Sequence, residues 1–243
     1  MSALGSPRVH LRLTDSTNER ARELAAAGAP SGTLVTAAEQ SAGRGRGGRR
    51  WSAPAGTSIL ASLVLRSPPE LLPLIAAVAV CEAVESATGA RPVVKWPNDV
   101  LLERDEQLGK LAGILAEGRP QDGWAVLGVG VNVAVTVEDL PPELHDGSGA
   151  SKLPAATLGL SPAKLEPVLE ALLSALERGL DESSERTLER WRARDALRGR
   201  QVAWNDGQGR AEGIDGLGRL VVELADGGRQ TLSAGEVHLR SIG

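Results

Sequence analysis

The segment from residue 43 to residue 51, GRGRGGRRW, has the residue types that bind an anion. Four arginines alternate with four glycines, and a tryptophan closes the segment. Guanidinium groups hold phosphates and carboxylates through charge-assisted hydrogen bonds, and glycines let backbone amides approach a bound anion. The composition therefore predicts a loop that binds a phosphate or a carboxylate.

Three better-known uses of such segments fit poorly. The glycines match G-x-G-x-x-G, but Pro54 follows closely and excludes the helix that would hold a pyrophosphate, and no Lys-Ser/Thr pair completes a P-loop. RNA-binding arginine–glycine segments usually repeat many times in a basic region, whereas this chain carries a net charge of −4. Considered alone, the loop is equally consistent with a solvated hairpin whose charges are incidental.

Further polar side chains stand at the ends of apolar, strand-like segments. KWPND supplies Lys95, Asn98 and Asp99, GKLAGIL supplies Lys110, and GVGVN supplies Asn132. Two lysines, several arginines and one carboxylate that could hold Mg²⁺ predict chemistry on a nucleoside triphosphate. Each motif alone is equally consistent with a turn or a surface charge.

The composition excludes several other classes of site. Cys81 is the only cysteine, so the chain has no internal disulfide, and its apolar surroundings predict a buried structural thiol. The three histidines share no ligand spacing. The sequence has neither a signal-type N-terminal segment nor 18 consecutive apolar residues, so we expect a cytoplasmic protein without a membrane partner.

Alternating apolar patterns predict the elements that position these side chains. Ser16 and Glu19 predict a capping box at the start of the first helix, and Gly28 predicts its end. We expect an α+β fold in which helices cover one face of a mixed, mostly antiparallel sheet. The expected strands are 8–13, 32–40, 57–65, 92–96, 99–103, 110–117 and 124–133; the expected helices are 14–28, 69–88, 162–180 and 184–196; 136–157 is expected to be a long loop.

The pattern of the sequence changes from helical to strand-like after residue 197. Short strand-like segments separated by glycine-rich turns follow one another about every eight to ten residues. The sequence therefore predicts two domains, 1–197 and 198–243, and the small second domain should pack on the first.

Taken together, the motifs DSTN, EQSAGRGRGGRRW, KWPND, GKLAGIL and GVGVN resemble those of the biotin protein ligase family, which is related to lipoate ligases. They occur in the order and approximate spacing of that family. The resemblance implies a biotin/lipoate ligase-like catalytic domain followed by a small SH3-like β-barrel domain. Only about 14 residues precede DSTN, so the chain resembles the monofunctional type without an N-terminal DNA-binding domain.

The resemblance also implies a reaction and its partners. Biotin and MgATP would give biotinyl-5′-AMP and pyrophosphate, and a lysine of a biotin carboxyl carrier protein domain would then accept the biotinyl group. That domain would belong to an acetyl- or acyl-CoA carboxylase or a pyruvate carboxylase. We expect no nucleic-acid partner, and either a monomer or a homodimer.

The matching positions imply specific roles. Lys110, Arg46 and Lys95 would act in catalysis, and Asp99 would hold Mg²⁺. Biotin would be bound by Ser16, Thr17, Asn18, Gln40, Gly43, Arg44, Gly45, Arg46, Lys110 and Gly113. ATP would be bound by Arg44, Arg46, Arg49, Trp51, Lys95, Asn98 and Asn132.

Elementary electrostatics agrees with this assignment. A carboxylate that attacks a phosphorus atom meets like charge, so catalysis depends on cations that are in place beforehand and on the positioning of both ligands. A lipoate or octanoate transferase of the same fold, or a catalytically silent sensor of biotin or adenylate, remain the alternatives.

Overall fold

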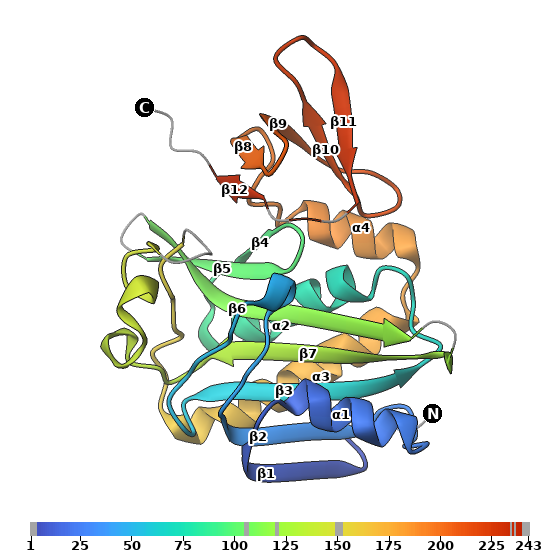
Figure 1. The fold of residues 1–243 in the computed structure, drawn as a ribbon, viewed down its shortest axis with the longest axis vertical. Coiled ribbons are helices and arrows are strands. Elements are labelled where there is room, and N and C mark those ends of the chain that lie inside the picture. Colours follow the sequence, from blue (N-terminus) through green and yellow to red (C-terminus); the bar gives the residue numbers. More distant parts are fainter. Residues whose placement is uncertain are drawn as a thin grey trace.

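Two β-sheets organise the chain (Figure 1), which a computed structural model describes for residues 4–104, 107–119, 122–148, 153–233, 235 and 237–239. The larger sheet has seven strands in the order β1-β2-β3-β7-β6-β5-β4. β1 and β2 pair in parallel, and all other neighbours pair antiparallel, which confirms the predicted mixed sheet. Its strands are β1 (Arg8–Thr14), β2 (Leu34–Gln40), β3 (Ser58–Arg66), β4 (Val93–Lys95), β5 (Asp99–Arg104), β6 (Gln107–Arg119) and β7 (Trp124–Asn132).

Helices pack on both faces of this sheet, so the expectation of one covered face was wrong. α1 (Thr17–Ala26) lies in front of the sheet in Figure 1, whereas α2 (Leu72–Thr88) and α3 (Leu165–Asp181) lie behind it. Ala21 of α1 packs with Val35 and Val64, while the adjacent Leu34 and Leu63 point to the opposite side and join the core around α2 and α3. Successive strand residues face opposite sides, so each strand feeds two apolar cores.

The first helix begins differently from the capping box that the sequence predicts. Ser16 occupies the N-cap position with extended backbone, but its side chain makes no capping hydrogen bond. Gly28 follows the helix with a φ of +90°, as expected of a residue that ends a helix. Ser16 lines a cavity instead, which is described below.

The second helix confirms the prediction for the only cysteine. Cys81 is completely buried in α2, and this burial raises the pKa of its thiol to about 12. A thiol with such a pKa stays protonated at neutral pH and is a poor nucleophile.

The C-terminal strands form a separate antiparallel sheet in the order β11-β10-β9-β8-β12. The described residues record no pairing that closes it into a barrel. Trp96 Nε1 donates to the carbonyl of Gly218 at 3.0 Å, and Arg192 donates to the carbonyl of Ile214 at 3.1 Å, so this sheet packs on the larger part as expected. Its strands are β8 (Gln201–Trp204), β9 (Gly207–Ile214), β10 (Leu220–Glu223), β11 (Arg229–Leu232) and β12 (His238–Leu239).

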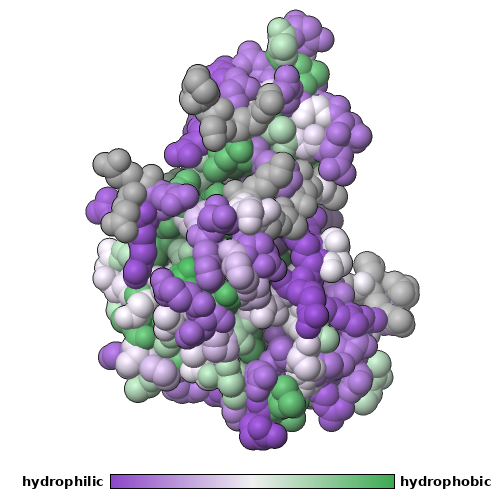
Figure 2. Space-filling view, turned by 60° about the vertical axis from the view of Figure 1, so that its left-hand side comes forward, coloured by the Kyte–Doolittle hydropathy of each residue, from purple (hydrophilic) through white to green (hydrophobic). Residues whose placement is uncertain are grey.

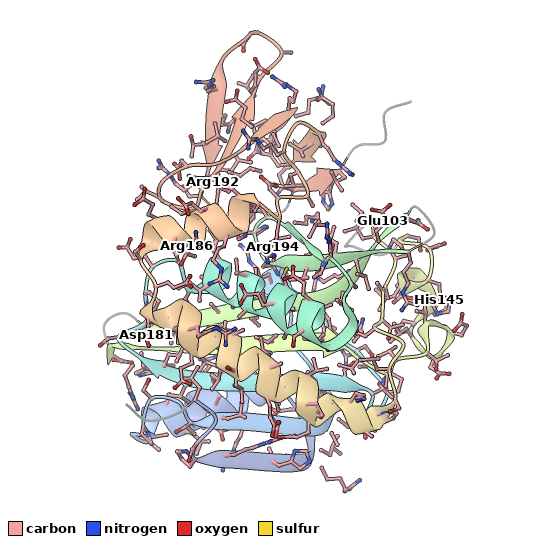
Figure 3. The ribbon with its side chains drawn as sticks, turned by 180° about the vertical axis from the view of Figure 1, so that it is seen from behind. Glu103, His145, Asp181, Arg186, Arg192 and Arg194 are labelled. Atoms are coloured by element: carbon pink, nitrogen blue, oxygen red, sulfur yellow. The ribbon has the colours of Figure 1, made fainter. Side chains whose placement is uncertain are left out.

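The connection between the two sheets contains less α-helix than the sequence predicts. The last helix, α4 (Ser184–Arg192), ends before residue 196, and 162–164 form a 3₁₀ turn, η5 (Pro162–Lys164), ahead of α3. The described part of the predicted loop 136–157 contains two more 3₁₀ turns, η3 (Val137–Asp139) and η4 (Pro142–Leu144). Figure 3 shows α3 and α4 from behind, with Arg186 and Arg192 on α4 and Arg194 in the turn that follows it.

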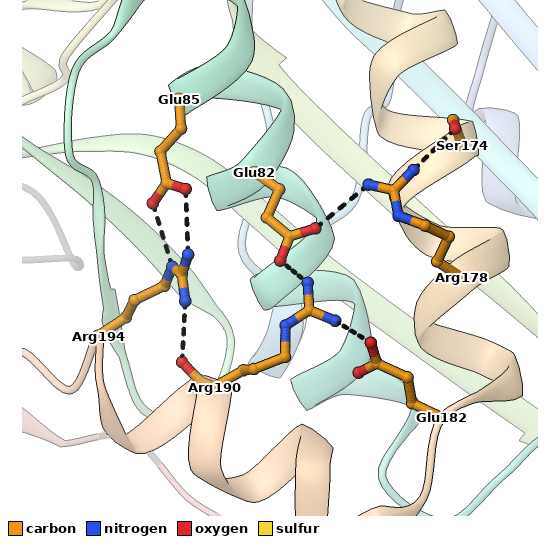
Figure 4. Close-up of polar contacts among 7 residues, drawn as sticks. All are labelled: Glu82, Glu85, Ser174, Arg178, Glu182, Arg190 and Arg194. Atoms are coloured by element: carbon orange, nitrogen blue, oxygen red, sulfur yellow. Dashed lines mark hydrogen bonds and ion pairs between the residues drawn. The ribbon is translucent and has the colours of Figure 1, made fainter.

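An ion-pair network joins α2, α3 and α4 (Figure 4). Arg190 of α4 contacts Glu82 of α2 and lies 2.5 Å from Glu182 Oε1, while Arg194 binds both carboxylate oxygens of Glu85. Arg178 of α3 also reaches Glu82. The network therefore fixes the helix that leads to the second sheet.

Hydrophilic residues cover most of the face shown in Figure 2, and strongly hydrophobic ones appear there only in small separate areas. Leu13 and Leu217 are the exposed large hydrophobic side chains of the described residues. Among the helices that the structure describes, none combines the length and the apolar character needed to cross a membrane.

Removal of Arg190 should destabilise the protein because it leaves Glu82 and Glu182 without their shared cation. The Arg190 side chain is 18% exposed, so we expect Arg190→Ala to lower the free energy of unfolding by about 2–4 kcal/mol. Arg186→Ala, on the same helix, breaks the ion pair between Arg186 and Glu189. Because the Arg186 side chain is 63% exposed, this change should lower the free energy of unfolding by less than about 0.5 kcal/mol. Urea unfolding of both variants measures the difference, and equal effects would contradict the structural role of the network.

Candidate active site

A cavity of about 520 Å³ opens on the side of the larger sheet where α1 begins. This volume lies within the range of about 300–1,000 Å³ that is usual for small-molecule sites. Most residues predicted from the sequence as ligand-binding line it: Ser16, Thr17, Asn18, Gln40, Arg44, Gly45, Arg46, Arg49, Trp51, Asn98, Lys110, Gly113 and Asn132. Gly43, Lys95 and Asp99 are not part of the lining.

One end of the cavity is polar and uncharged. Gln40, the last residue of β2, accepts a hydrogen bond from the backbone N–H of Thr17 at 2.7 Å, which ties the strand to the start of α1. Gly43 stands behind this contact: a Cβ there would lie 2.7 Å from Gln40 Nε2 and 2.4 Å from the carbonyl oxygen of Trp51. Gly43 therefore acts through the close approach of the loop backbone, which leaves no room for a side chain.

The arginine–glycine loop folds back on itself as a small hairpin. Gly45 donates to the carbonyl of Arg49 at 2.7 Å, and a 3₁₀ turn, η1 (Arg46–Gly48), forms its tip with positive φ at Gly47 and Gly48. Positive φ is the conformation that glycine adopts without strain. The glycines therefore shape the turn while the arginines around them face the cavity.

Two arginines of the loop are held by other elements. Arg44 pairs with Glu19 of α1 at 3.0 Å, and Arg46 donates to Asn98 Oδ1 at 3.3 Å. Asn98 in turn donates to the carbonyl of Ile114 in β6 at 3.1 Å. In this structure Asn98, predicted to bind ATP, therefore anchors Arg46, another of the predicted ATP-binding residues.

Trp51 lies flat against the sheet because two paired glycines leave space for it. Gly113 of β6 and Gly130 of β7 are register neighbours, and Cβ atoms there would lie 3.0 Å and 2.6 Å from the indole ring. Lys110 Nζ lies 5.9 Å from the ring centroid, within reach of a cation–π contact. The indole thus forms one wall beside the cationic part of the cavity.

A buried carboxylate between two lysines marks the other end of the site. Asp99 Oδ1 lies 2.7 Å from Lys110 Nζ, and Oδ2 lies 3.6 Å from Lys95 Nζ. The side chains of Asp99 and Lys95 are each 3% exposed. Burial alone would raise the pKa of Asp99, but the charges of Lys110 and Lys95 outweigh it and lower the pKa below its ordinary value.

This arrangement does not fit the predicted Mg²⁺ site on Asp99. Both carboxylate oxygens face ammonium groups, whereas Mg²⁺ needs oxygen ligands free of competing cations. Within the described residues, no group of three or more acidic, histidine or cysteine side chains could hold a metal ion. Asp99 serves here as the counter-ion of the two lysines, and a metal that accompanies a nucleotide would need its ligands elsewhere.

Several residues of the cavity are not predicted from the sequence. Gly128 lies beside Asn18, and a Cβ on Gly128 would be 2.1 Å from Asn18 Oδ1. Gly128 belongs to the GVGVN motif, of which only Asn132 is predicted to bind a ligand. The side of the cavity formed by Leu140, Pro141, Glu143, Leu144, Leu153 and Ala155 belongs to the predicted long loop. Its proline-rich, aperiodic sequence carries no signal for a ligand site.

Comparison with known proteins is consistent with this geometry. Residues 10–133 match the Biotin/lipoate A/B protein ligase family, and residues 199–240 match the Biotin protein ligase C terminal domain. The fold and site thus define the class of the biotin and lipoate ligases. With both matches in sequence, this chain belongs to the biotin protein ligase family.

Individual relatives cover the chain to different extents. It is 36% identical to the Biotin--[acetyl-CoA-carboxylase] ligase of Paracoccus denitrificans over 93% of this chain and 98% of that protein. It is 39% identical to the Bifunctional ligase/repressor BirA of Bacillus spizizenii, but that match spans 59% of this chain and only 45% of the relative. The structure of the biotin protein ligase from Aquifex aeolicus in complex with biotin and ATP superposes with a TM-score of 0.76, at 25% identity, over 97% of this chain and 99% of that chain.

Replacing Asp99 by asparagine should reveal its role as counter-ion. We expect Asp99→Asn to lower the free energy of unfolding by about 2–4 kcal/mol at neutral pH, since two poorly exposed lysines lose the negative charge between them. Because the folded pKa is depressed, this contribution is present above the unfolded pKa of about 3.9 and is lost as the pH falls through the lower folded value.

The stability difference between wild type and Asp99→Asn should therefore stay constant down to about pH 5 and shrink below about pH 4. Urea unfolding at a series of pH values measures it. Asp206→Asn, at an exposed position, is the control and should stay within about 0.5 kcal/mol of wild type. A difference that already shrinks near about pH 6 would contradict a lowered pKa.

Proposed function

We propose that this protein is an ATP-dependent biotin protein ligase. It forms biotinyl-5′-AMP and pyrophosphate from biotin and ATP, then transfers the biotinyl group to a lysine of a biotin carboxyl carrier protein domain. The observation that carries this proposal is one cavity with a neutral hydrogen-bonding end at Thr17 and Gln40 and a cationic end at Lys110, Arg46 and Arg49. Biotin has the matching polarity, with a polar uncharged ring at one end and a carboxylate at the other.

The first step forms a bond between a biotin carboxylate oxygen and the α-phosphorus of ATP, and pyrophosphate leaves with the electrons of the broken P–O bond. The ammonium of Lys110 neutralises the two anions as they approach, and Arg46, anchored on Asn98, adds a second positive charge. Asp99 holds Lys110 in place through their 2.7 Å contact. Lys95 lies behind Lys110 and acts through Asp99, so we assign it to positioning and to the electrostatic field.

In the second step, the amine of the carrier lysine attacks the acyl carbon, AMP leaves, and the amine loses a proton. No nucleophile of the chain is needed, because the mixed anhydride is already activated. Ser16, Thr17, Asn18 and Gln40 keep the bicyclic ring in place. Trp51, Arg49 and Asn132 line the part of the cavity where we place the nucleotide.

The polar end of the cavity favours biotin over lipoate or octanoate. A purely apolar acyl tail in contact with Thr17 and Gln40 would leave buried polar groups without partners, which costs binding energy. We further propose that residues 1–197 form the catalytic domain and 198–243 a C-terminal domain. The carrier domain of an acetyl-CoA carboxylase is the partner we propose first.

Pyrophosphate release with biotin and ATP, followed by labelling of a purified carrier domain, tests the function. We expect both activities with biotin and neither with lipoate or octanoate. Turnover of lipoate without turnover of biotin would reassign the protein to lipoate chemistry. Tight binding of biotin without pyrophosphate release would identify a sensor.

Truncation of Lys110 should impair adenylate formation much more than folding. Since Lys110 is the cation nearest to the reacting carboxylate in this proposal, we expect Lys110→Ala to lower the rate of pyrophosphate release by roughly a hundredfold or more. Lys164→Ala, at an exposed position, should keep the wild-type rate. An unchanged rate for Lys110→Ala, in protein shown to be folded by circular dichroism, would remove Lys110 from the mechanism.

A further inference from the structure

A buried chain of hydrogen bonds lies directly behind the neutral end of the cavity. Ser62 of β3 is completely buried, and its Oγ lies 2.8 Å from Thr17 Oγ1 and 2.6 Å from Asn18 Oδ1. Glu117 of β6 lies at the far end of the chain, in contact with Asn18. Neither Ser62 nor Glu117 lines the cavity, so neither can be a direct ligand of a bound molecule.

The amide of Asn18 has only one orientation that satisfies its neighbours. Its Nδ2 donates to Glu117 Oε2 at 2.8 Å and to the carbonyl of Leu115 at 3.3 Å. Both N–H groups are thereby used, and Oδ1 must face Ser62. An amide oxygen can only accept, so the single hydroxyl proton of Ser62 is committed to Asn18.

This commitment fixes the hydroxyl of Thr17 as well. With its proton given to Asn18, Ser62 can only accept from Thr17, and the 2.8 Å contact directs the Thr17 proton away from the cavity. The alternative acceptor, Gln40 Oε1, lies farther away at 3.1 Å and already accepts from the Thr17 backbone. Thr17 therefore offers the cavity a lone pair, as an acceptor.

Gln40 offers the opposite polarity. Its Oε1 is turned toward the Thr17 backbone N–H, so its amide N–H₂ is the group available to a bound molecule. An acceptor and a donor then stand side by side at the cavity end. A cyclic urea carries an N–H donor beside a carbonyl acceptor and satisfies both.

We propose that Ser62 and Glu117 are positioning residues that set ligand specificity: acting through Asn18, they hold the Thr17 hydroxyl as an acceptor and so select a ligand with a urea N–H. This inference rests on the proposed function, since biotin is the ligand that carries the urea ring. It adds two residues outside the cavity to those that determine which acid is activated.

Calorimetric binding of biotin to purified variants is the first test. Ser62→Ala removes the nearest acceptor of the Thr17 proton and frees that proton to turn toward the ligand, so we expect biotin to bind about tenfold more weakly. Glu117→Gln keeps an acceptor for Asn18 and should bind within about twofold of wild type. Glu117→Ala removes that acceptor, lets the Asn18 amide rotate, and should resemble Ser62→Ala.

Ser58→Ala is the matched control for loss of a buried hydroxyl. Ser58 lies on the same face of the same strand, is also buried, and donates to Asn132 at 3.2 Å rather than to the chain behind Thr17. We expect its biotin affinity to stay within about twofold of wild type. The affinity of Ser62→Ala for ATP should be equally unaffected.

An altered ligand separates positioning from a general structural effect. In the two isomeric biotin analogues that have an oxygen in place of one urea N–H, one isomer sets two acceptors against each other at Thr17. That isomer should bind wild type about tenfold more weakly than biotin. In Ser62→Ala the Thr17 hydroxyl can donate, so the preference for biotin over that isomer should fall to less than about threefold.

The proposed function and the inference can be contradicted separately. Absence of biotin binding by the wild-type protein would overturn the proposed function itself. Wild-type binding that Ser62→Ala leaves unchanged, or an undiminished preference for biotin over both analogues in that variant, would overturn the inference alone. An equal loss for Glu117→Gln and Glu117→Ala would remove Glu117 from it.

Discussion

The buried contact between Asp99 and two lysines is the constraint on which the site depends. Lys95 ends β4 and Asp99 begins β5, and the two residues are register neighbours across the hairpin that joins these strands. Lys110 reaches the same carboxylate from β6. A buried charge without a partner of opposite charge is costly. The three strands must therefore meet in this register, which also holds Lys110, the lysine that lines the cavity, in place.

The same three residues also separate two kinds of electrostatics within one cavity. At their end, Lys110, Arg46 and Arg49 line the cavity, and Asp99 lies against Lys110 as its counter-ion. At the end formed by Thr17 and Gln40, it uses neutral groups whose hydrogen-bond directions are fixed by neighbours. In the function proposed above, a ligand that is charged at one end and polar but neutral at the other would fit this cavity in one orientation, with its acid group toward Lys110.

Much of this site could be predicted because strand ends carry its chemistry. Asn98, Lys110 and Asn132 follow or begin apolar runs, and antiparallel pairing places such positions close together. The partners of Asp99 could not be predicted, since sequence spacing does not say whether a carboxylate faces a metal or two ammonium groups. Ser62 was equally hidden, because a serine within a long apolar strand looks like a neutral replacement.

The fold shows the same limit. Val35 and Leu34 are both apolar, as are Val64 and Leu63, so no alternation in the sequence reveals that α1 covers the second face. The failed capping box has a related cause. Ser16 stands where a cap is expected, but it lines the cavity without capping the helix, and only the folded chain shows which of the two occurs.

The contact between Trp96 and Gly218 bears on how such a protein can change over evolutionary time. Trp96 stands between Lys95 and Asn98 in one short turn, yet its indole is buried against the turn that connects β9 and β10. A Cβ on Gly218 would lie 3.0 Å from both Leu71 and Leu74, so there is little room for a side chain in the turn between β9 and β10. The two sheets therefore fit each other as a pair. A C-terminal sheet from another protein, grafted onto this chain, would have to supply its own acceptor for the Trp96 indole, close in sequence to Asn98 of the cavity lining.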